Sequence, residues 1–288
     1  MGKLFWYLNR LQAMDLQEVC WRVQQRLLVK AEKRRFGKQR VRVDGEVWND
    51  ALRELGFDAG ALGINLDNAH YSTITEVHRL QGPDYGKWPD TFSYDLTYKQ
   101  RDDLGDARTC WEKHRHFRFA LLAKAAYVSG DSRLLAYLND EQDRWCEQHT
   151  FLHGIAWTSV MEVAIRAVNW MVTLAFCKDE KLAERLRTGV INMTDYLTRH
   201  YSRFSSANNH LLVEAAAIGL AGYAFGYRPW KELGMALLSK ELLNQNYEDG
   251  VNKELSLHYQ TFGMEAYCLM MRAMQAHDDE IPTTWYRM

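Results

Sequence analysis

Two polar stretches, about fifty residues apart, contain the residue types that could do chemistry. The first is Asn208-Asn209-His210, which directly precedes a long apolar run, and the second is a turn followed by Tyr259. An amide and an imidazole can donate hydrogen bonds to a carboxylate, and a phenol can exchange a proton. We therefore interpret Asn209, His210 and Tyr259 as a set that could remove a proton from carbon next to a carboxylate.

The first stretch lies where a buried helix is expected to begin. Ser206 is a candidate N-cap. Apolar residues recur at helical spacing behind it, at Leu211, Leu212, Ala215 and Ile218. The Asn-Asn-His triplet would then lie on the first helical turn, where free N–H groups and the helix dipole favour negative charge.

A second tier of candidate residues is predicted to bind substrate. Glu162 and Arg166 are four residues apart on a predicted helix, so they share one face and can pair. Two interpretations stay open: an ion pair beside the core, or a cleft in which Arg166, held by Glu162, binds carboxylate or sulfate. The set is completed by Trp157, Gln260 and His258.

Metal-dependent and cofactor-dependent chemistry is not indicated. His114 and His116 are two residues apart and would face different sides of a helix. His210 and His258 have no companion at the spacing of zinc ligands, and no phosphate-binding or dinucleotide-binding glycine motif occurs. The five cysteines are scattered and contain no C-x-x-C pair. We therefore predict no metal and no cofactor.

Composition restricts the class of partner. The formal net charge of −1 over 288 residues argues against nucleic-acid binding. Ten Trp and fifteen Tyr fit either helix packing or a cleft whose rings stack on sugars. No apolar run is long enough to span a bilayer, and no signal peptide is visible. The expected location is the cytoplasm, or the periplasm if a leader was removed.

Helical patterning predominates from Asp106 onward. The candidate helices cover 108–128, 131–148, 158–177, 180–202, 208–225, 230–246 and 256–276. The breaks between them are short, and no region shows the alternation of a β-strand. This pattern predicts an all-α fold of antiparallel helix pairs in a toroid, solenoid or bundle. The absence of a fixed repeat makes a TPR-type or HEAT-type array less favoured.

Three segments are predicted along the chain. Residues 1–45 form an N-terminal helical arm, residues 46–105 an irregular connector that packs on the helical domain, and residues 106–288 that domain. From Arg22 to Arg42 there are nine Lys or Arg residues against one Glu. This charge run fits a solvated helix face or, alternatively, a contact with an acidic glycan or another domain.

Five short motifs occur in order along nearly the whole chain. They are Val77-His78-Arg79-Leu80-Gln81-Gly82, Gly105-Asp106 with Trp111-Glu112, Trp157 to Trp170, Asn208-Asn209-His210, and Glu254-x-Ser256-x-x-Tyr259. This ordered set resembles the N-terminal domain of the heparinase II/III family. Members of that family are polysaccharide lyases, with an (α/α) toroid followed by a C-terminal β-sandwich domain. They cleave by β-elimination at a uronic acid.

The resemblance implies a fold, partners and roles. The fold is an incomplete (α/α) toroid, and the partners are an acidic polysaccharide or oligosaccharide and a C-terminal β-sandwich domain in the full-length protein. Asn209 and His210 would neutralise the uronate carboxylate, and Tyr259 would be the catalytic tyrosine. Family lyases often have Tyr-His where this chain has Tyr259-Gln260. A proton carrier could therefore be lost, and His258 is a candidate substitute.

A lyase domain is the favoured function, with two alternatives. The chain stops where the β domain of the family should begin, so we expect a truncated lyase or an isolated toroid, nearly inactive alone. The first alternative is a non-catalytic glycan-binding module. The second is an α/α-toroid glycoside hydrolase that uses two carboxylates, with Glu162 and Glu254 as candidates. Only elimination creates a 4,5-unsaturated uronate that absorbs in the ultraviolet.

Overall fold

The structure is a computed structural model of the chain. It describes residues 14–64, 66, 83–99, 101 and 103–287. The motif expected at Val77 to Gly82 therefore lies outside the described residues. Two compact units make up the chain, residues 1–40 and residues 41–288. The three-segment division proposed above, with boundaries at residues 45 and 105, stays a prediction.

The first unit contains the helix α2 (Leu16–Phe36), which lies within the residues predicted to form an N-terminal helical arm. Asp15 is its N-cap, and the Asp15 side chain accepts a hydrogen bond from the backbone N–H of Glu18 at 2.7 Å. The last turn carries Lys33, Arg34 and Arg35, whose positive charges complement the negative end of the helix dipole.

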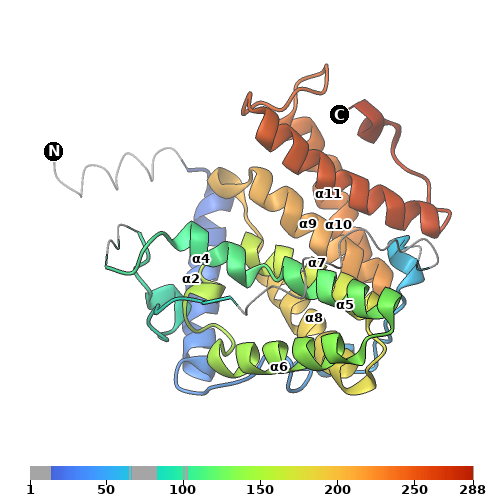
Figure 1. Cartoon of the computed structure of the whole chain (residues 1–288). Coiled ribbons are helices and arrows are strands. Elements are labelled where there is room, and N and C mark those ends of the chain that lie inside the picture. The colour runs from blue at the N-terminus through green and yellow to red at the C-terminus, as the bar shows by residue number, and fades with distance from the viewer. Residues whose placement is uncertain (1–13, 65, 67–82, 100, 102, 288) are drawn as a thin grey trace. The chain divides into compact units, whose positions relative to one another are not determined.

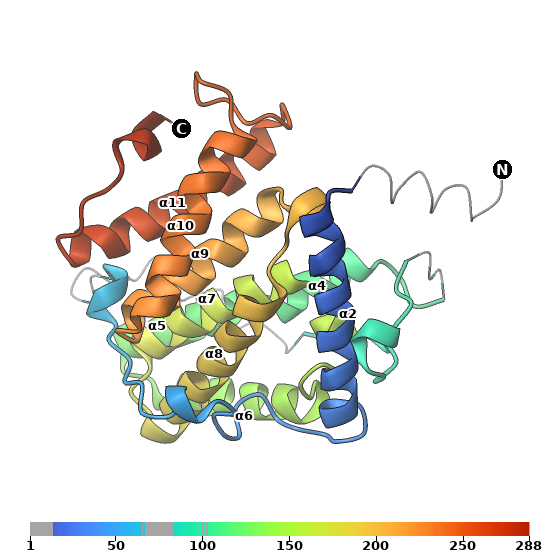
Figure 2. The same ribbon diagram turned by 180° about the vertical axis from the view of Figure 1, so that it is seen from behind.

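In the described part of the second unit, eight α-helices follow one another (Figures 1 and 2). They are α4 (Ala107–His114), α5 (Phe117–Ser129), α6 (Ser132–Gln148), α7 (Val160–Phe176), α8 (Glu180–His200), α9 (Asn209–Ala224), α10 (Arg228–Gln245) and α11 (Leu257–Ala276). Short 3-10 helices lie between several of them. The β structure among the described residues is limited to two isolated bridges. The prediction of an all-α fold is confirmed.

The helices are arranged as antiparallel pairs in two layers. Helices α5, α7, α9 and α11 pack side by side in sequence, as Figure 1 shows. The second layer is formed by α6, α8 and α10, which are seen more directly in Figure 2. Each of these packs on the helix that precedes it in the chain, and the connections are two or three residues long. This is the predicted incomplete (α/α) toroid.

Helix α9 is the most deeply buried element of the second unit. Every one of its residues except His210 is buried. Its contacts are with α7, α8, α10 and α11. Glycines allow the close approach, because Gly219 faces Gly234 of α10 and Gly222 faces the backbone of Lys231. The prediction that residues 208–225 form an inner, buried helix is confirmed.

The helix predicted over 108–128 is broken in two, so that prediction was wrong. The backbone of His116 adopts a left-handed conformation with φ 61°, which ends α4 and starts α5. The break is stabilised from α7: Asn169 Nδ2 donates to the carbonyl of Arg115 at 2.9 Å, and Trp170 Nε1 donates to His116 Nδ1 at 2.8 Å. Apolar periodicity continues through this point, so it did not reveal the break.

We expect Gly222→Ala to destabilise the protein by about 1–3 kcal/mol, because overpacking at a close helix contact forces the backbones apart. The added Cβ would collide with the backbone nitrogen of Lys231. The measurement is the free energy of unfolding by chemical denaturation. Gly56→Ala is the matched control, since nothing lies within 4 Å of its added Cβ. Equal stability of the two variants would contradict the close packing of α9 on α10.

Candidate active site

The Asn-Asn-His triplet starts the buried helix α9. Asn208 is the N-cap, and its side chain accepts a hydrogen bond from the backbone N–H of His210 at 3.1 Å. The expectation that Ser206 caps the helix was wrong, because Ser206 closes a 3-10 helix that precedes it (Phe204–Ser206). Asn209 is only 5% exposed. The remaining member, His210, is therefore the one residue of α9 that reaches the surface.

Two carboxylates act on His210. Burial lowers the pKa of the His210 imidazole, and the negative charges of Glu162 and Glu254 raise it in partial compensation. The net direction is downward, so the imidazole is neutral at pH 7 and offers one N–H donor and one acceptor. Glu162 on α7 and Glu254 before α11 therefore both lie near His210 at the start of α9.

Asn209 is linked directly to Glu254. Its Nδ2 donates to Glu254 Oε1 at 3.4 Å, which joins the start of α9 to the residues just before α11. At the opposite ends of the same helices, Tyr223 Oη donates to Asp279 at 2.6 Å. The two helices therefore run side by side in the same direction. Tyr259, the third residue of α11 and 39% exposed, lies at the same end as Asn209. That Asn209, His210 and Tyr259 contact one sugar ring stays a prediction.

Gln260 supports the loop that holds Glu254. Its Oε1 accepts from the backbone N–H of Asn252 at 2.6 Å, and its Nε2 donates to the carbonyl of Gly250 at 3.2 Å. Asn252 Oδ1 in turn accepts from the backbone N–H of Glu254 at 2.9 Å. Both ends of the Gln260 amide are thus engaged by the loop, and in this structure it acts as a support. These contacts favour a supporting role for Gln260 over the predicted role in substrate binding.

Gln245 is a supporting residue that the sequence analysis missed. Its side-chain Nε2 donates to the backbone carbonyl of Asn208 at 3.0 Å. Its backbone carbonyl accepts from the backbone N–H of Lys253 at 2.8 Å. One residue at the end of α10 therefore ties the N-cap of α9 to the loop before α11. No local pattern indicates this role, because both partners are distant in sequence.

The predicted pair of Glu162 with Arg166 was wrong. Glu162 accepts two hydrogen bonds from Arg115, at 2.6 and 2.9 Å, and is 1% exposed. Arg166 is fully buried and donates to the carbonyls of His114 and Ala156, at 3.2 and 3.1 Å. A fork bound to backbone carbonyls inside the core does not line a cleft. Arg115, which the sequence analysis did not single out, is the cation next to the candidate site.

The two aromatic members of the predicted binding set have different positions. Trp157 is buried, and its ring packs edge-on against Phe151 at 4.8 Å between centroids. It therefore cannot serve as a platform for a sugar in this structure, and that prediction was wrong. His258 is exposed, and its ring centroid lies 5.7 Å from that of Tyr259. Its predicted role in substrate binding stays a prediction.

A buried carboxyl group anchors the loop that leads to the triplet. Glu214 of α9 accepts from the backbone N–H of Ser202 at 2.5 Å and from the Ser202 hydroxyl at 3.0 Å. Burial raises the pKa of Glu214 to about 8. Farther along this loop, Phe204 has a left-handed backbone with φ 55°. Such strained residues persist only where surrounding contacts hold them.

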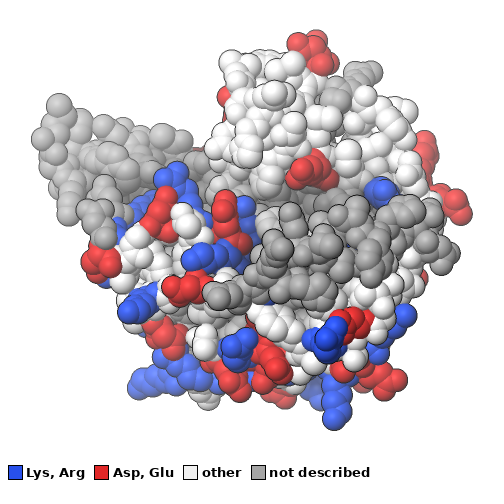
Figure 3. All heavy atoms as spheres, viewed as in Figure 1, with Lys and Arg blue, Asp and Glu red and all other residues white. Residues whose placement is uncertain are grey.

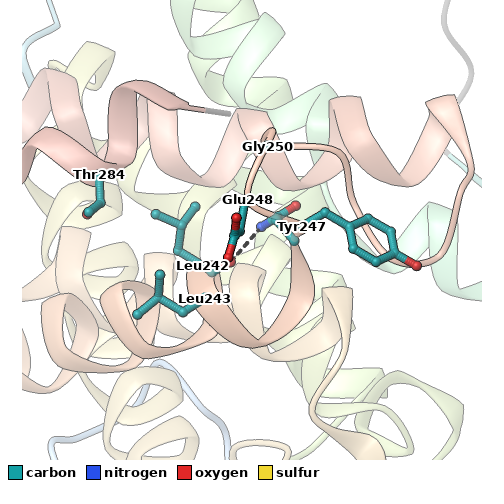
Figure 4. Close-up of a pocket in the computed structure, with 7 residues that line it drawn as sticks. Leu242, Leu243, Tyr247, Glu248, Gly250 and Thr284 are labelled. Carbon is teal, nitrogen blue, oxygen red and sulfur yellow. Dashed lines mark hydrogen bonds between the residues drawn. The ribbon is translucent and has the colours of Figure 1, made fainter.

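The described residues also line a cavity that is separate from the predicted site residues. A cavity of about 370 Å³ lies beside the loop after α10 and is lined by Leu242, Leu243, Asn246, Tyr247, Glu248, Gly250 and Thr284 (Figure 4). None of the predicted site residues lines it. Within the described ranges, no group of three or more His, Cys, Asp or Glu residues could hold a metal ion. No described helix is long and apolar enough to cross a membrane.

The fold and the ordered motifs define an (α/α)-toroid domain of the polysaccharide-lyase type. The sequence profile described as "Heparinase II/III N-terminus" matches residues 9–288. The chain belongs to this family, as the resemblance of its motifs indicated.

Two curated relatives share the similarity. A heparin-sulfate lyase from Bacteroides thetaiotaomicron is 29% identical over 159 residues, which is 51% of this chain and 22% of that protein. A heparin-sulfate lyase from Bacteroides stercoris is 24% identical over 185 residues, 55% of this chain and 28% of that protein. The matched part of the chain spans less than a third of either relative.

Solved structures show the same fold. A crystal structure of heparinase III has a TM-score of 0.51 at 20% identity and covers 91% of this chain and 40% of that one. A mutant of the heparan sulfate lyase HepC from Pedobacter heparinus has a TM-score of 0.51 at 18% identity, covering 90% of this chain and 41% of that one. Identities this low support the helical architecture alone.

We expect Glu254→Gln to lower the pKa of His210, because it removes one of the two negative charges that favour the imidazolium. The amide oxygen of the new residue can still accept from Asn209. The measurement is an NMR pH titration of the His210 ring. Glu248→Gln, on the same loop, is the control and should leave the titration unchanged. An unaltered pKa of His210 in Glu254→Gln would show that this carboxylate does not act on the imidazole.

We expect Gln260→His to loosen the loop before α11 instead of restoring a proton carrier. A shorter imidazole cannot satisfy both Asn252 N–H and the Gly250 carbonyl, and a lost hydrogen bond costs about 1 kcal/mol. Amide hydrogen exchange at Asn252 should become faster. Gln275→His, at an exposed position of α11, is the control. Unchanged protection at Asn252 would mean that the loop does not depend on Gln260.

Proposed function

We propose that this chain forms the helical domain of a polysaccharide lyase that cleaves a uronate-containing acidic polysaccharide or oligosaccharide by β-elimination. The observation that carries the proposal is the start of α9. There, a capped helix terminus presents His210 as its single surface residue, with Asn209 beneath it and Tyr259 at the same end of the neighbouring helix. Membership of the heparinase II/III family supports the same chemistry.

The donors at this helix start suit the chemical problem. The proton at C5 of a uronate is too weakly acidic to be removed unless the charge of the adjacent carboxylate is offset. The amide of Asn209 and the neutral imidazole of His210 would donate hydrogen bonds to that carboxylate as negative charge develops on it. Tyr259 would exchange a proton with the sugar, at C5 or at the leaving oxygen.

The substrate class follows from the relatives and remains part of the proposal. The curated relatives are named heparin-sulfate lyases, so heparan sulfate is the first polymer to test. The matched chain spans less than a third of these proteins, and the proposal therefore concerns the helical side of the cleft. A C-terminal β-sandwich domain in the full-length protein would supply the opposite side.

Hydrolysis by two carboxylates is less well supported. Glu162 is buried, and both of its carboxylate oxygens accept hydrogen bonds from Arg115. A general acid for glycoside hydrolysis must instead present its carboxyl group to the glycosidic oxygen. Glu254 alone cannot supply both roles.

We expect the full-length protein to generate ultraviolet-absorbing unsaturated uronate from at least one of heparan sulfate, hyaluronan, chondroitin and alginate. Asn209→Ala should lower the turnover by about 10²–10³, because it removes a donor to the developing charge. Tyr259→Phe keeps the ring and removes its proton, so turnover should fall while binding persists.

Matched controls separate chemistry from folding. Asn49→Ala also removes an asparagine that donates to a carboxylate, since Asn49 Nδ2 donates to Asp195 Oδ1 at 3.3 Å, and both residues lie outside α9, α11 and the loop between α10 and α11. Tyr286→Phe removes an exposed phenol. Both should retain full activity. Tight glycan binding by the full-length protein with no new absorbance on any of the four polymers would favour a non-catalytic binding module.

A further inference from the structure

A second cavity lies at the start of α4, outside the candidate active site. Its volume is about 580 Å³, and its lining includes two aromatic rings, Tyr98 and Trp111, and three cations, Lys99, Arg101 and Arg108. Its combination of rings and cations fits a ligand that has apolar faces and negative charges together, which is the chemistry of an acidic sugar.

The aromatic part of the cavity is rigid. The rings of Tyr98 and Trp111 meet edge to face with centroids 5.3 Å apart. The indole N–H of Trp111 donates to the carbonyl of Ile155 at 3.1 Å and to the hydroxyl of Thr158 at 3.0 Å. Trp111 is nevertheless only partly buried. A ring fixed in this way loses little conformational freedom when a ligand packs on it.

The cations are available for exchange of partners. Arg101 binds Asp103 through two contacts of 2.7 Å, and Arg108 lies 3.2 Å from Asp106. The Arg108 side chain is 83% exposed, and an ion pair that water surrounds contributes little to stability. A carboxylate or sulfate of a ligand can therefore replace the aspartate at little cost.

The charge balance around the cavity favours an anion only slightly. The described residues around the cavity have one more positive than negative charge. The cations are Lys99, Arg101 and Arg108, and the carboxylates are Asp103 and Asp106. Figure 3 shows Lys, Arg, Asp and Glu side chains interspersed on the side of this face where Figure 1 places α4. Recognition would depend on directed contacts more than on a basic surface.

The cavity is connected to the candidate active site along two helices. Trp111 and Arg115 are four residues apart, and their partners Thr158 and Glu162 are also four apart. The end of α4 and the residues that lead into α7 thus lie alongside each other. Glu162 is the carboxylate whose charge acts on His210. Arg115 and Glu162 therefore lie between the cavity at Trp111 and the imidazole of His210.

We propose that the cavity of Tyr98, Arg108 and Trp111 is a second saccharide subsite, which binds an acidic sugar unit of the same glycan whose uronate lies at Asn209 and His210. This inference rests on the proposed function. It adds that affinity depends on the length of the glycan, because a short ligand at the active site cannot also occupy the cavity.

Calorimetric titration of the protein with two heparan sulfate fragments, a disaccharide and an octasaccharide, tests the proposal. We expect the octasaccharide to bind more tightly. Arg108→Ala should weaken the octasaccharide by about 10-fold, as expected for loss of a charged hydrogen bond, and leave the disaccharide unchanged. Arg228→Ala is the matched control, because Arg228 is 84% exposed and also pairs with a carboxylate, Glu232. It should change neither affinity.

Trp111 gives a second, independent arm. Trp111→Ala should weaken only the octasaccharide, and Trp111→Phe should retain much of the affinity because a ring remains. If Trp111→Ala does not fold, Arg108→Ala still decides the matter. Equal affinity of Arg108→Ala and Arg228→Ala for the octasaccharide would overturn the subsite, as would equal affinity of the unaltered protein for both fragments.

The same titration separates this inference from the proposed function. Asn209→Ala should weaken both fragments, because the uronate of each would lie at the active site. If Asn209→Ala changes neither affinity while Arg108→Ala weakens the octasaccharide, the proposed active site is wrong and the subsite stands. If Asn209→Ala weakens both and Arg108→Ala weakens neither, the subsite alone is wrong.

Discussion

A buried guanidinium determines how the helices of the second unit meet. Arg166, on α7, has no exposure to solvent, and it donates to the carbonyl of His114 at the end of α4 and to that of Ala156 in the 3-10 helix before α7. The Cζ atom of Arg166 lies 4.9 Å from the ring centroid of Trp145 and 4.8 Å from that of Trp157. Burial lowers the pKa of Arg166 to about 10, so it stays charged at neutral pH. Removing a charge from water costs several kcal/mol, and these partners are what offset it.

The buried cation also sets the surroundings of the candidate site. Arg166 is satisfied by carbonyls and rings, so Glu162 on the same helix binds a different cation, Arg115. That pairing draws the end of α4 onto the start of α7 and leaves Glu162 close enough to act on His210. The position of α4, and with it Trp111, therefore follows from how one buried charge is satisfied.

Sequence patterns predicted the helices well where one rule decides the structure. The apolar run after His210 requires burial, and α9 is the buried helix that it indicated. The end of the helix before His116 was not predictable, because it depends on Asn169 and Trp170 from α7. Helical spacing likewise allowed Glu162 to pair with Arg166. The choice between Arg166 and Arg115 depends on which cation the fold buries, and spacing contains no information about that.

The proposed function requires that an acidic ligand be recognised by a chain whose formal charge is only −1. Glu162 is compensated by Arg115, and Glu254 accepts from the amide of Asn209, so neither carboxylate is left without a donor. His210 is neutral because burial outweighs both carboxylates. Attraction for an anion would therefore come from hydrogen-bond donors positioned at the start of α9. The free backbone N–H groups of a helix start also favour negative charge. Such donors act at short range and depend on position, so the supports that fix them, Gln245 and Gln260, matter as much as the donors themselves.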